Sequence, residues 1–538
     1  MLPKLPLGGH GHHRRSSSVN GSRSSMEEHS RPVSPEEETV VEPEQGNVLS
    51  HIISQLRPGA DLSRVTLPTF ILEPRSMLER ITNFMAHPET LLPMSEIDDP
   101  LQRFVAVVKF YLSGWHIKPP GVKKPLNPIL GETFTGYWEY ADGTRGYYIA
   151  EQTSHHPPKS SYFFMAPEHH IRIDGTLKPR SKFLGNSAAS IMEGIAILSL
   201  LNRGQKGRGE RYTLTQPNMY ARGILFGKMK FELGDHSYVR CPENNLVADL
   251  EFKTKGYFSG TYDAIGGIIK NEETGEVYYE ISGFWNGEMF IRDVATGQKE
   301  LLFDATNAKH TPPLTRPLEE QGERESQKLW HSTVQALIAK DHDLATAEKT
   351  KIEDRQRQEA AARVEKGIEW HPKLFRRVKG GPGGPEEGEE DLDWILNATI
   401  DPLDPEVAVR QILAVAPIVE GQAISHEFDI PPRSSLHQSR EHTEAQSQSA
   451  SRQSIQENLI DFGDDEPSQP AVSTKPKTDN KVDLLGEDDE EVHAKDSFGS
   501  GNPPGLMAPL KPTMSEHHPL RRIDTNSSDV DEFVDAQG

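Results

Sequence analysis

The stretch Glu151-Gln152-Thr153-Ser154-His155-His156-Pro157-Pro158 decides how the rest of the chain is interpreted. It lies between two strand-like runs, residues 146–150 and 160–165. Because proline has no N–H group to donate to a sheet, this segment must end a strand or lie at a sheet edge. The residue before a proline is restricted to extended conformations, which predicts an extended backbone at His156.

The two adjacent histidines favour an anion site over a metal site. Successive side chains of an extended segment point to opposite faces, so the two imidazole rings should not converge on one metal ion. Ring N–H donors beside the Lys159 ammonium instead suit an anion with several oxygens, such as phosphate. The alternative is a strand closed by prolines whose two histidines are simply solvated.

Composition limits the class of protein. The chain has 538 residues, of which 40 are proline, 43 are glycine and only 35% are hydrophobic, and this predicts long unfolded portions beside a folded part. The single cysteine, Cys241, excludes an internal disulfide framework and a cysteine-based zinc site, and it favours a reducing compartment. No apolar run approaches the roughly 20 residues that span a bilayer, and the N-terminus lacks the apolar core of a signal peptide. We therefore expect a soluble intracellular protein.

The net charge of −22 is unevenly distributed. Residues 421–538 contain 10 Lys and Arg against 23 Asp and Glu, so −13 of the total falls in this tail. The overall charge therefore says little about the partners of the folded part. We expect residues 1–45 and 431–538, which have little apolar surface to bury, to be disordered.

The pattern of short segments predicts a mainly β fold with a helical appendix. From residue 133 to residue 292 the chain alternates short strand-like runs with turn signals, which is typical of an antiparallel barrel or sandwich. One helix, over about residues 185–198, is expected to interrupt these strands. A helix capped near Asp99 and running through Leu112 should precede them. Residues 319–366 should form helices with a break near 341–343.

Two helical faces are candidates for function. Val48, Leu49, Ile52, Ile53 and Leu56 form one apolar stripe on a short helix that Pro58-Gly59 should end. Lys349, Glu353 and Arg357 share one face at i, i+4 and i+8, where Glu353 can pair with either neighbour. The ordinary interpretations are a stripe that packs on a core, and an exposed helix with charge pairs worth about 0.2–0.5 kcal/mol each.

Three segments together resemble the oxysterol-binding protein family. Residues 151–158 resemble its EQxSHHPP fingerprint, residues 124–132 resemble its KPLNPxLGE signature, and the Lys349-Glu353-Arg357 face resembles its third element. The resemblance implies a large antiparallel lipid-binding β-barrel with an N-terminal helical lid and a C-terminal helical region. It implies no enzyme, cofactor or metal, and the sequence contains no GxSxG, P-loop or HExxH motif.

The resemblance also implies which residues bind lipid. The phosphatidylinositol 4-phosphate headgroup would be held by Lys124, Asn127, His155, His156, Lys349, Glu353 and Arg357. The segment around residues 52–73, residues 181–186 and the KLFRR run at 373–377 are most similar to the phosphatidylserine-exchanging subgroup. That similarity implies contacts of the second lipid with Leu67, Lys124, Asn127 and Ser181, a sterol being the alternative second lipid. The lid residues would be Leu49, Ile52, Ile53 and Leu56.

The implied organisation covers the whole chain. Residues 46–378 would form the lipid-binding domain, with the lid at 46–60, the barrel at about 115–310 and helices at 319–366. Residues 379–391 would be a linker, and 392–430 a short extension that docks on the domain. At the end of the chain, Glu532, Phe533, Asp535 and Ala536 lie in a segment that resembles the EFFDAxE motif for tail-anchored receptors of the endoplasmic reticulum, with Val534 and Gly538 as departures.

We therefore expect an intracellular lipid transfer protein. It would exchange phosphatidylserine for phosphatidylinositol 4-phosphate between membranes, peripherally at contacts of the endoplasmic reticulum and plasma membrane. The alternatives are a sterol exchanger or sterol sensor of the same family, and a lipid-regulated scaffold. The expected partners are these lipids, transient membrane surfaces and the tail-anchored receptor, with no nucleic acid.

Overall fold

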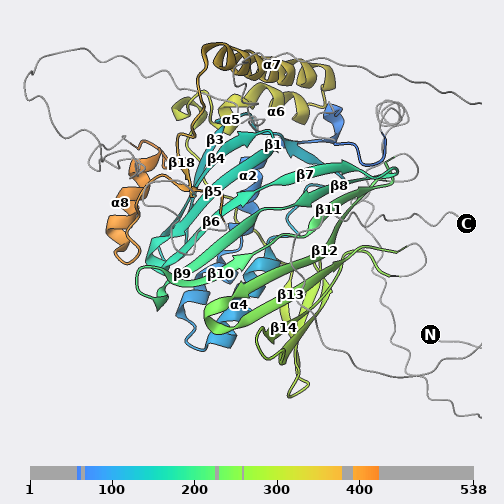
Figure 1. Ribbon diagram of the computed structural model, residues 1–538, viewed down its shortest axis with the longest axis vertical. Helices are drawn as coiled ribbons and strands as arrows, with labels where there is room; N and C mark the ends of the chain where they lie inside the picture. The colour runs from blue at the N-terminus through green and yellow to red at the C-terminus, as the bar shows by residue number, and fades with distance from the viewer. Residues whose placement is uncertain (1–56, 62–66, 225–228, 257–259, 379–391, 423–538) are drawn as a thin grey trace, which may run out of the picture. The chain divides into compact units, whose positions relative to one another are not determined.

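A large antiparallel sheet organises the described part of the chain (Figure 1). The computed structural model describes residues 57–61, 67–224, 229–256, 260–378 and 392–422. Along its main path the sheet contains, in spatial order, β17 (Lys299–Asp304), β16 (Glu288–Asp293), β15 (Val277–Phe284), β14 (Ala264–Asn271), β13 (Leu246–Lys253), β12 (Lys230–Cys241), β10 (Gly209–Leu214), β9 (Ile195–Gln205), β6 (Ile171–Leu177), β5 (Pro158–Ala166), β4 (Arg145–His155) and β3 (Thr133–Glu139). Three further strands join beside β12: β11 (Asn218–Arg222), β8 (Ser187–Met192) and β7 (Pro179–Phe183).

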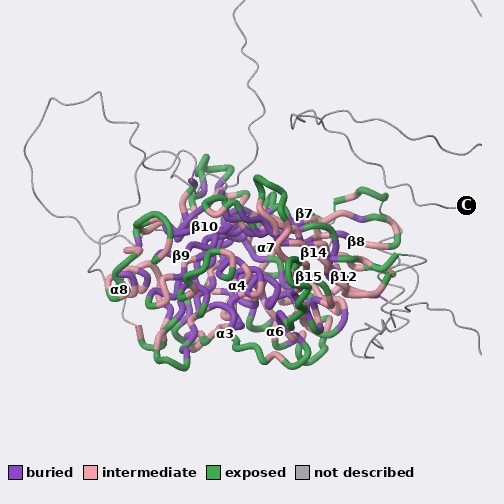
Figure 2. Tube along the Cα trace, turned by 90° about the horizontal axis from the view of Figure 1, so that it is seen from below, coloured by how far each residue is buried: buried purple, intermediate pink, exposed green. Residues whose placement is uncertain are grey.

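The N-terminal helices cover one face of this sheet. They are α2 (Met77–Arg80), α3 (Pro88–Leu91) and α4 (Pro100–Ser113), with the short turns η3 (Thr69–Ile71), η4 (Ile81–Met85) and η5 (Leu92–Glu96). The predicted cap of α4 is confirmed, because the Asp99 side chain accepts a hydrogen bond from the backbone N–H of Gln102 at 2.8 Å. Leu78 and Phe104 from the helices pack in one buried cluster with sheet residues such as Phe164. Figure 2 shows the buried part of the chain lying centrally, with the exposed segments around it.

The helix expected over about residues 185–198 is absent from the structure, and that prediction was wrong. The segment instead forms β8 and the start of β9. In β9 the buried Ala196, Leu198 and Leu200 recur at every second position and face the helix-covered side of the sheet. Neighbouring strands β6 and β10 supply the hydrogen-bond partners of β9, so tertiary pairing overrides the helix-like local composition.

The sheet is curved, but its two outermost strands do not pair with each other. Within the described residues, β17 and β3 end the main path, so hydrogen bonds do not close the expected barrel. The edge of β3 is covered by the chain that follows β17. Tyr137 and Leu314 exchange two backbone hydrogen bonds of 2.9 and 2.7 Å, and the Thr133 N–H donates to the Arg324 carbonyl at 3.0 Å. This cover satisfies an edge that would otherwise expose unpaired backbone groups.

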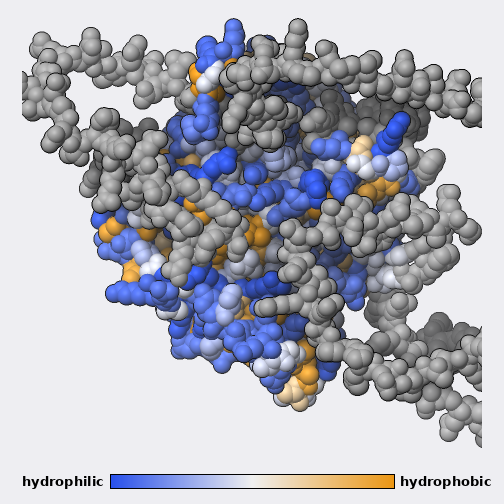
Figure 3. Space-filling view, in the orientation of Figure 1, coloured by the Kyte–Doolittle hydropathy of each residue, from blue (hydrophilic) through white to orange (hydrophobic). Residues whose placement is uncertain are grey.

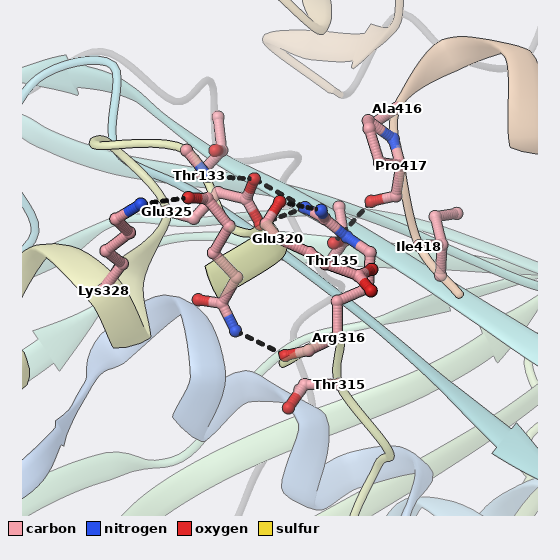
Figure 4. A network of polar contacts seen from close by, with 12 residues as sticks. Thr133, Thr135, Thr315, Arg316, Glu320, Glu325, Lys328, Ala416, Pro417 and Ile418 are labelled. Carbon is pink, nitrogen blue, oxygen red and sulfur yellow. Dashed lines mark hydrogen bonds and ion pairs between the residues drawn. The ribbon is translucent and has the colours of Figure 1, made fainter. Parts of the chain in front are cut away.

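A polar network holds this covering segment in place (Figure 4). The guanidinium of Arg316 donates to both oxygens of Glu325, at 2.6 and 2.5 Å. The same view shows the Thr135 hydroxyl, which donates to the Pro417 carbonyl at 2.9 Å and so ties β3 to the C-terminal part of the chain.

Helices after the sheet match the expected region. They are η8 (Leu318–Glu320), α5 (Ser326–Leu329), α6 (His331–Ile338) and α7 (His342–Lys366), and η6 (Pro167–His169) and η7 (Pro242–Asn244) are short turns within the sheet region. The predicted break falls at Asp341, whose side chain accepts a hydrogen bond from Leu344 N at 2.9 Å and caps α7. A separate parallel pair, β1 (Leu72–Ser76) and β2 (Lys124–Leu126), lies against these helices.

Residues 373–378 and 392–422, here called the C-terminal extension, pack on the sheet. This extension contains β19 (Trp394–Leu396), which pairs with β18 (Phe375–Arg377), and α8 (Pro405–Val415). Trp394 and Ile412 pack with Phe163 and Met165, which point away from the helix-covered face of the sheet. Both faces of β4 and β5 are therefore covered, one by the N-terminal helices and the other by the extension.

The surface is largely hydrophilic on the face shown in Figure 3, with small apolar patches between polar ones. Among the helices that the structure describes, none is both long enough and apolar enough to cross a membrane.

One buried carboxylate, that of Glu132, joins three separate segments. It accepts hydrogen bonds from Ser76 Oγ at 2.5 Å, Ser326 Oγ at 2.6 Å, Trp330 Nε1 at 2.8 Å and the Ile129 N–H at 3.1 Å. Burial raises its pKa, and the four donors oppose that rise. The loop before β3, the end of β1 and the start of the helical region are thus held at one point.

Replacing Glu132 by alanine should strongly destabilise the fold. The change leaves several buried donors without an acceptor, and each such donor costs about 1–3 kcal/mol, so we expect a loss of at least about 3 kcal/mol in the free energy of unfolding. Glu139→Ala is the matched control, because Glu139 is exposed and paired only with exposed Arg145, and it should cost less than about 1 kcal/mol. Urea denaturation compares the two variants, and equal losses would contradict the anchoring role of Glu132.

Candidate functional site

The histidine pair lies at the tip of a tight hairpin. β4 ends at His155 and β5 begins at Pro158, which confirms that the prolines mark a strand end. The prediction of two rings on opposite faces was wrong: the ring centroids of His155 and His156 lie 4.5 Å apart, edge to face. His156 sits in the turn rather than in the strand, so the alternation of strand side chains does not apply to it. The two rings therefore present their donors from one place.

The first half of the fingerprint builds the hairpin rather than the binding surface. Glu151, Gln152, Thr153 and Ser154 are all buried. The Gln152 side chain donates to the Ser154 carbonyl at 2.8 Å and accepts from Ser160 Oγ at 2.6 Å. Ser154 Oγ donates to the Pro157 carbonyl at 2.7 Å, which braces the turn that carries the histidines.

Glu151 anchors the hairpin to the C-terminal extension. Its two carboxylate oxygens accept the backbone N–H groups of Lys373 at 2.8 Å and Leu374 at 2.7 Å. Burial raises the pKa of Glu151 to about 7, although the backbone donors lower it. The fingerprint glutamate is therefore a structural anchor.

The signature loop lies against this hairpin. The Gly131 N–H donates to the Gln152 carbonyl at 3.0 Å, and the Gln152 N–H donates to the Glu132 carbonyl at 2.8 Å. Burial lowers the pKa of His155 to about 4, the neighbouring His156 lowers it further, and a hydrogen bond to the Pro128 backbone opposes both. His155 is therefore a neutral imidazole near pH 7, half-buried beside the loop.

Helix α7 brings a second lysine to the loop. Ile352 packs in one cluster with Leu126 and Ile129, and this places the Lys349 turn of α7 beside β2. At the start of the same helix, Thr69 Oγ1 donates to the His342 carbonyl at 3.2 Å. The first strand pair and α7 are thus packed together near Lys124.

Lys124 and Lys349 repel one another across this contact. The pKa of Lys124 is lowered first by burial and then by the charge of Lys349, while Asp61 raises it. Within the described residues, no hydrogen bond or ion pair to the Lys124 ammonium is present. Lys349 forms an ion pair with Glu353 on its own helix, as the spacing predicts. Two cations from distant segments therefore lie close together, with Asp61 acting on Lys124 and Glu353 paired with Lys349.

The structure brings some predicted headgroup residues together and not others. The loop that carries Lys124 contacts both the hairpin that carries His155 and the helix that carries Lys349. Asn127 is in the same loop and its side chain is exposed. Arg357 is largely exposed and forms an ion pair with Asp354 at 2.5 Å, so it does not face the cluster.

Ser181 and Leu67 lie on segments next to the lysines. Ser181 shares a strand face with Phe183, which packs with Phe70, Ile71 and Val122. Leu67 is half-buried two residues before Thr69. The predicted lid residues Leu49, Ile52, Ile53 and Leu56, and the tail residues Glu532, Phe533, Asp535 and Ala536, lie outside the described residues.

Sequence reasoning missed several residues that shape the site. Lys159, expected to favour phosphate, instead forms an ion pair with Asp393. Asp61, which stabilises the charge of Lys124, has no motif to mark it. A cavity of about 300 Å³ elsewhere is lined by residues including Glu73, Arg75 and His310, and none of the predicted site residues lines it.

The fold and the hairpin–loop–helix cluster define the class of protein. The family model "Oxysterol-binding protein" matches residues 51–337 and 332–400. The fold is also that of the Osh1 ORD domain solved in complex with cholesterol, with a TM-score of 0.53 and 22% identity, covering 63% of this chain and 86% of that one.

Comparison with individual proteins makes the assignment more specific. Oxysterol-binding protein homolog 6 of Saccharomyces cerevisiae is 48% identical over 459 residues, covering 84% of this chain and 99% of its own length. Oxysterol-binding protein-like protein OBPalpha of Candida albicans is 51% identical over 405 residues, covering 75% of this chain and 92% of its own. The chain belongs to the oxysterol-binding protein family, whose members bind and transfer lipids and are not enzymes.

Titration of Glu151 should make stability depend on pH. Its folded pKa of about 7 lies above the ordinary value of 4.5, so between these values the folded protein keeps a proton that the unfolded chain has released. The contribution of Glu151 should be greatest below pH 4.5 and fall by about 3 kcal/mol as the pH rises through 7.

The measurement is the difference in free energy of unfolding between wild type and Glu151→Gln across this pH range. The contributions of all other titrating groups are the same in both proteins and cancel in this difference. A difference that does not change with pH would show that Glu151 stays ionised in the fold.

Proposed function

We propose that this protein exchanges phosphatidylserine for phosphatidylinositol 4-phosphate between membranes. The observation that carries the proposal is the meeting of Lys124 and Lys349, two like charges from segments far apart in sequence, at the loop that also contacts the His155 hairpin. Glu353 pairs with Lys349 and Asp61 acts on Lys124, but the two ammonium groups still repel each other, and a phosphate between them would be attracted by both. This arrangement of charge favours an anionic ligand.

Several donors suit a phosphorylated inositol. Its phosphate oxygens lose water on binding and each needs a replacement donor. The lysines provide charge, the two imidazoles provide directional N–H groups, and Asn127 and the loop amides remain for ring hydroxyls. Glu353 holds Lys349 in place, and Arg357 would have to leave Asp354 to join the headgroup.

In this proposal the two lipids use some of the same binding residues, and this overlap makes the protein an exchanger. Lys124 and Asn127 are assigned to both headgroups, so one lipid must leave before the other enters. Ser181 and Leu67 are assigned to phosphatidylserine alone. Their segments pack beside Val122 and Phe70, which supports a second lipid entering next to the phosphate donors.

The remaining parts of the proposal concern organisation and place. Residues 46–378 form the lipid-binding domain, and residues 46–60 act as its lid. The domain works peripherally on membranes at or near contacts of the endoplasmic reticulum and plasma membrane. The segment containing Glu532, Phe533, Asp535 and Ala536 docks on a receptor of the endoplasmic reticulum.

Replacing both histidines should remove phosphoinositide binding without unfolding the protein. His155→Ala with His156→Ala deletes two donors to phosphate, and hydrogen bonds to charged groups contribute about 1.5–3 kcal/mol each, so affinity should fall at least about tenfold. His236→Ala is the matched control, because this exposed histidine pairs with Asp249 on another strand pair. Normal binding of phosphatidylinositol 4-phosphate vesicles by the double variant would refute the site.

Transfer between two liposome populations should identify the lipid pair. Phosphatidylserine should move quickly, and phosphatidylinositol 4-phosphate in the acceptor liposomes should accelerate it. Ser181→Ala should slow phosphatidylserine transfer. Ser187→Ala is the matched control and should not slow it, because Ser187 lies on the opposite face of β8 from Ser190, the residue that pairs with Ser181.

Transfer of sterol in place of phosphatidylserine would overturn the assignment of Leu67 and Ser181 while keeping the family. Absence of transfer for every lipid would favour the scaffold alternative.

A further inference from the structure

The C-terminal extension grips the histidine hairpin on both of its strands. On β4, Glu151 accepts the backbone N–H groups of Lys373 and Leu374. On β5, Lys159 Nζ lies 3.2 Å from Asp393 Oδ2. The register pairs Ser154 with Lys159 and His155 with Pro158, so the two grips flank the turn that presents the histidines.

Asp393 also joins the hairpin to the next strand. The same Oδ2 atom lies 2.6 Å from Lys178 Nζ, directly after β6. Because Ser160 pairs with Leu177, the two lysines are neighbours across β5 and β6. One carboxylate thus neutralises two adjacent ammonium groups that would otherwise repel each other.

The position of Asp393 is itself fixed by the extension. Its carbonyl accepts the Val378 N–H at 3.1 Å, and the following residue, Trp394, pairs with Arg377 in the β18–β19 ladder. Although partial burial raises the pKa of Asp393, the two lysines lower it below its usual range, so the group is ionised at neutral pH. A fixed, charged carboxylate is able to hold a lysine in one place.

Lys159 does not belong to the headgroup cluster in this arrangement. On β5 it alternates with Ser160 and shares a face with Phe163 and Met165, which pack under the extension. Its ammonium is directed to Asp393 instead of to the loop that carries Lys124. Lys159 therefore links the hairpin to the extension through its ion pair with Asp393.

We propose that Asp393 is a positioning residue for phosphoinositide binding, acting through Lys159 on the His155–His156 turn. This inference rests on the proposed function. Phosphatidylserine is assigned to Leu67, Lys124, Asn127 and Ser181, none of which lies on the hairpin. A less firmly held hairpin should therefore weaken the binding of phosphatidylinositol 4-phosphate and leave the binding of phosphatidylserine unchanged. In this way the extension sets the ratio of the two affinities.

The test compares binding of the full chain to vesicles containing phosphatidylinositol 4-phosphate with binding to vesicles containing phosphatidylserine. Asp393→Asn should lower phosphoinositide affinity by roughly three- to tenfold, the effect of removing one half-buried charge pair, with phosphatidylserine affinity unchanged. Asp393→Glu, which keeps the charge, should restore most of the phosphoinositide affinity.

Two further variants separate positioning from general stability. Lys159→Ala should reproduce the loss, and the double variant with Asp393→Asn should lose no more than either alone, because both remove the Lys159–Asp393 ion pair through which Asp393 acts on the hairpin. Ile412→Ala creates a cavity where the extension packs on Phe163 and Met165, away from the turn that carries the histidines, and should lower the melting temperature while leaving the ratio of the two affinities unchanged.

The outcomes are distinguishable. An unchanged affinity ratio in Asp393→Asn, or an equal loss for both lipids, would overturn the positioning role and leave the proposed function intact. Failure of the wild-type protein to bind phosphatidylinositol 4-phosphate vesicles would overturn the proposed function, and this inference with it.

Discussion

The whole arrangement depends on buried carboxylates that are fully supplied with hydrogen-bond donors. Glu132 joins the end of β1, the signature loop and the start of the helical region, and Glu151 joins the hairpin to the C-terminal extension. A carboxylate is costly to bury, so it persists inside a protein only where donors surround it. Each of these groups therefore enforces one relative placement of the segments that donate to it, because any other placement leaves a buried charge unsatisfied.

The two glutamates explain why the family motifs are longer than the binding surface. In both motifs the glutamate is directed into the protein, and the groups proposed to face the ligand are the neighbouring Lys124, His155 and His156. Some motif residues fix the backbone by hydrogen bonds inside the protein, and the others are side chains that this backbone directs toward the proposed site. The charged residues divide in the same way. The carboxylates of Glu132 and Glu151 are hydrogen-bonded inside the protein, whereas Lys124 and Lys349 lie at the proposed site even though the chain carries a net charge of −22.

Sequence patterns predicted the local features of this structure and missed the long-range ones. The cap at Asp99, the break at Asp341, the strand end at the prolines and the Lys349–Glu353 pair each depend on residues a few positions apart, which propensity and spacing can show. The segment 185–198 was wrongly predicted as a helix because its strand partners lie elsewhere in the chain. The proximity of Lys124 and Lys349 was reached only through family resemblance, since no local pattern links residues so far apart. The exposed position of Arg357 and the tether from Asp393 to Lys159 had no sequence signal at all, because both depend on which side chain happens to lie opposite in the folded state.

The side chains of the proposed headgroup site differ in how firmly the protein holds them. The hairpin is braced by Ser154, Gln152 and the extension before any lipid binds, and a donor held in advance loses little entropy on binding. Arg357 is in the opposite situation, since it is exposed, has its own acidic partner and must reorganise to reach a phosphate. A preformed pair of histidines would therefore select the headgroup, whereas recruitment of a flexible arginine would add affinity at an entropic cost. An exchanger benefits from this division, because a site that is specific yet incompletely closed can recognise its lipid and still release it.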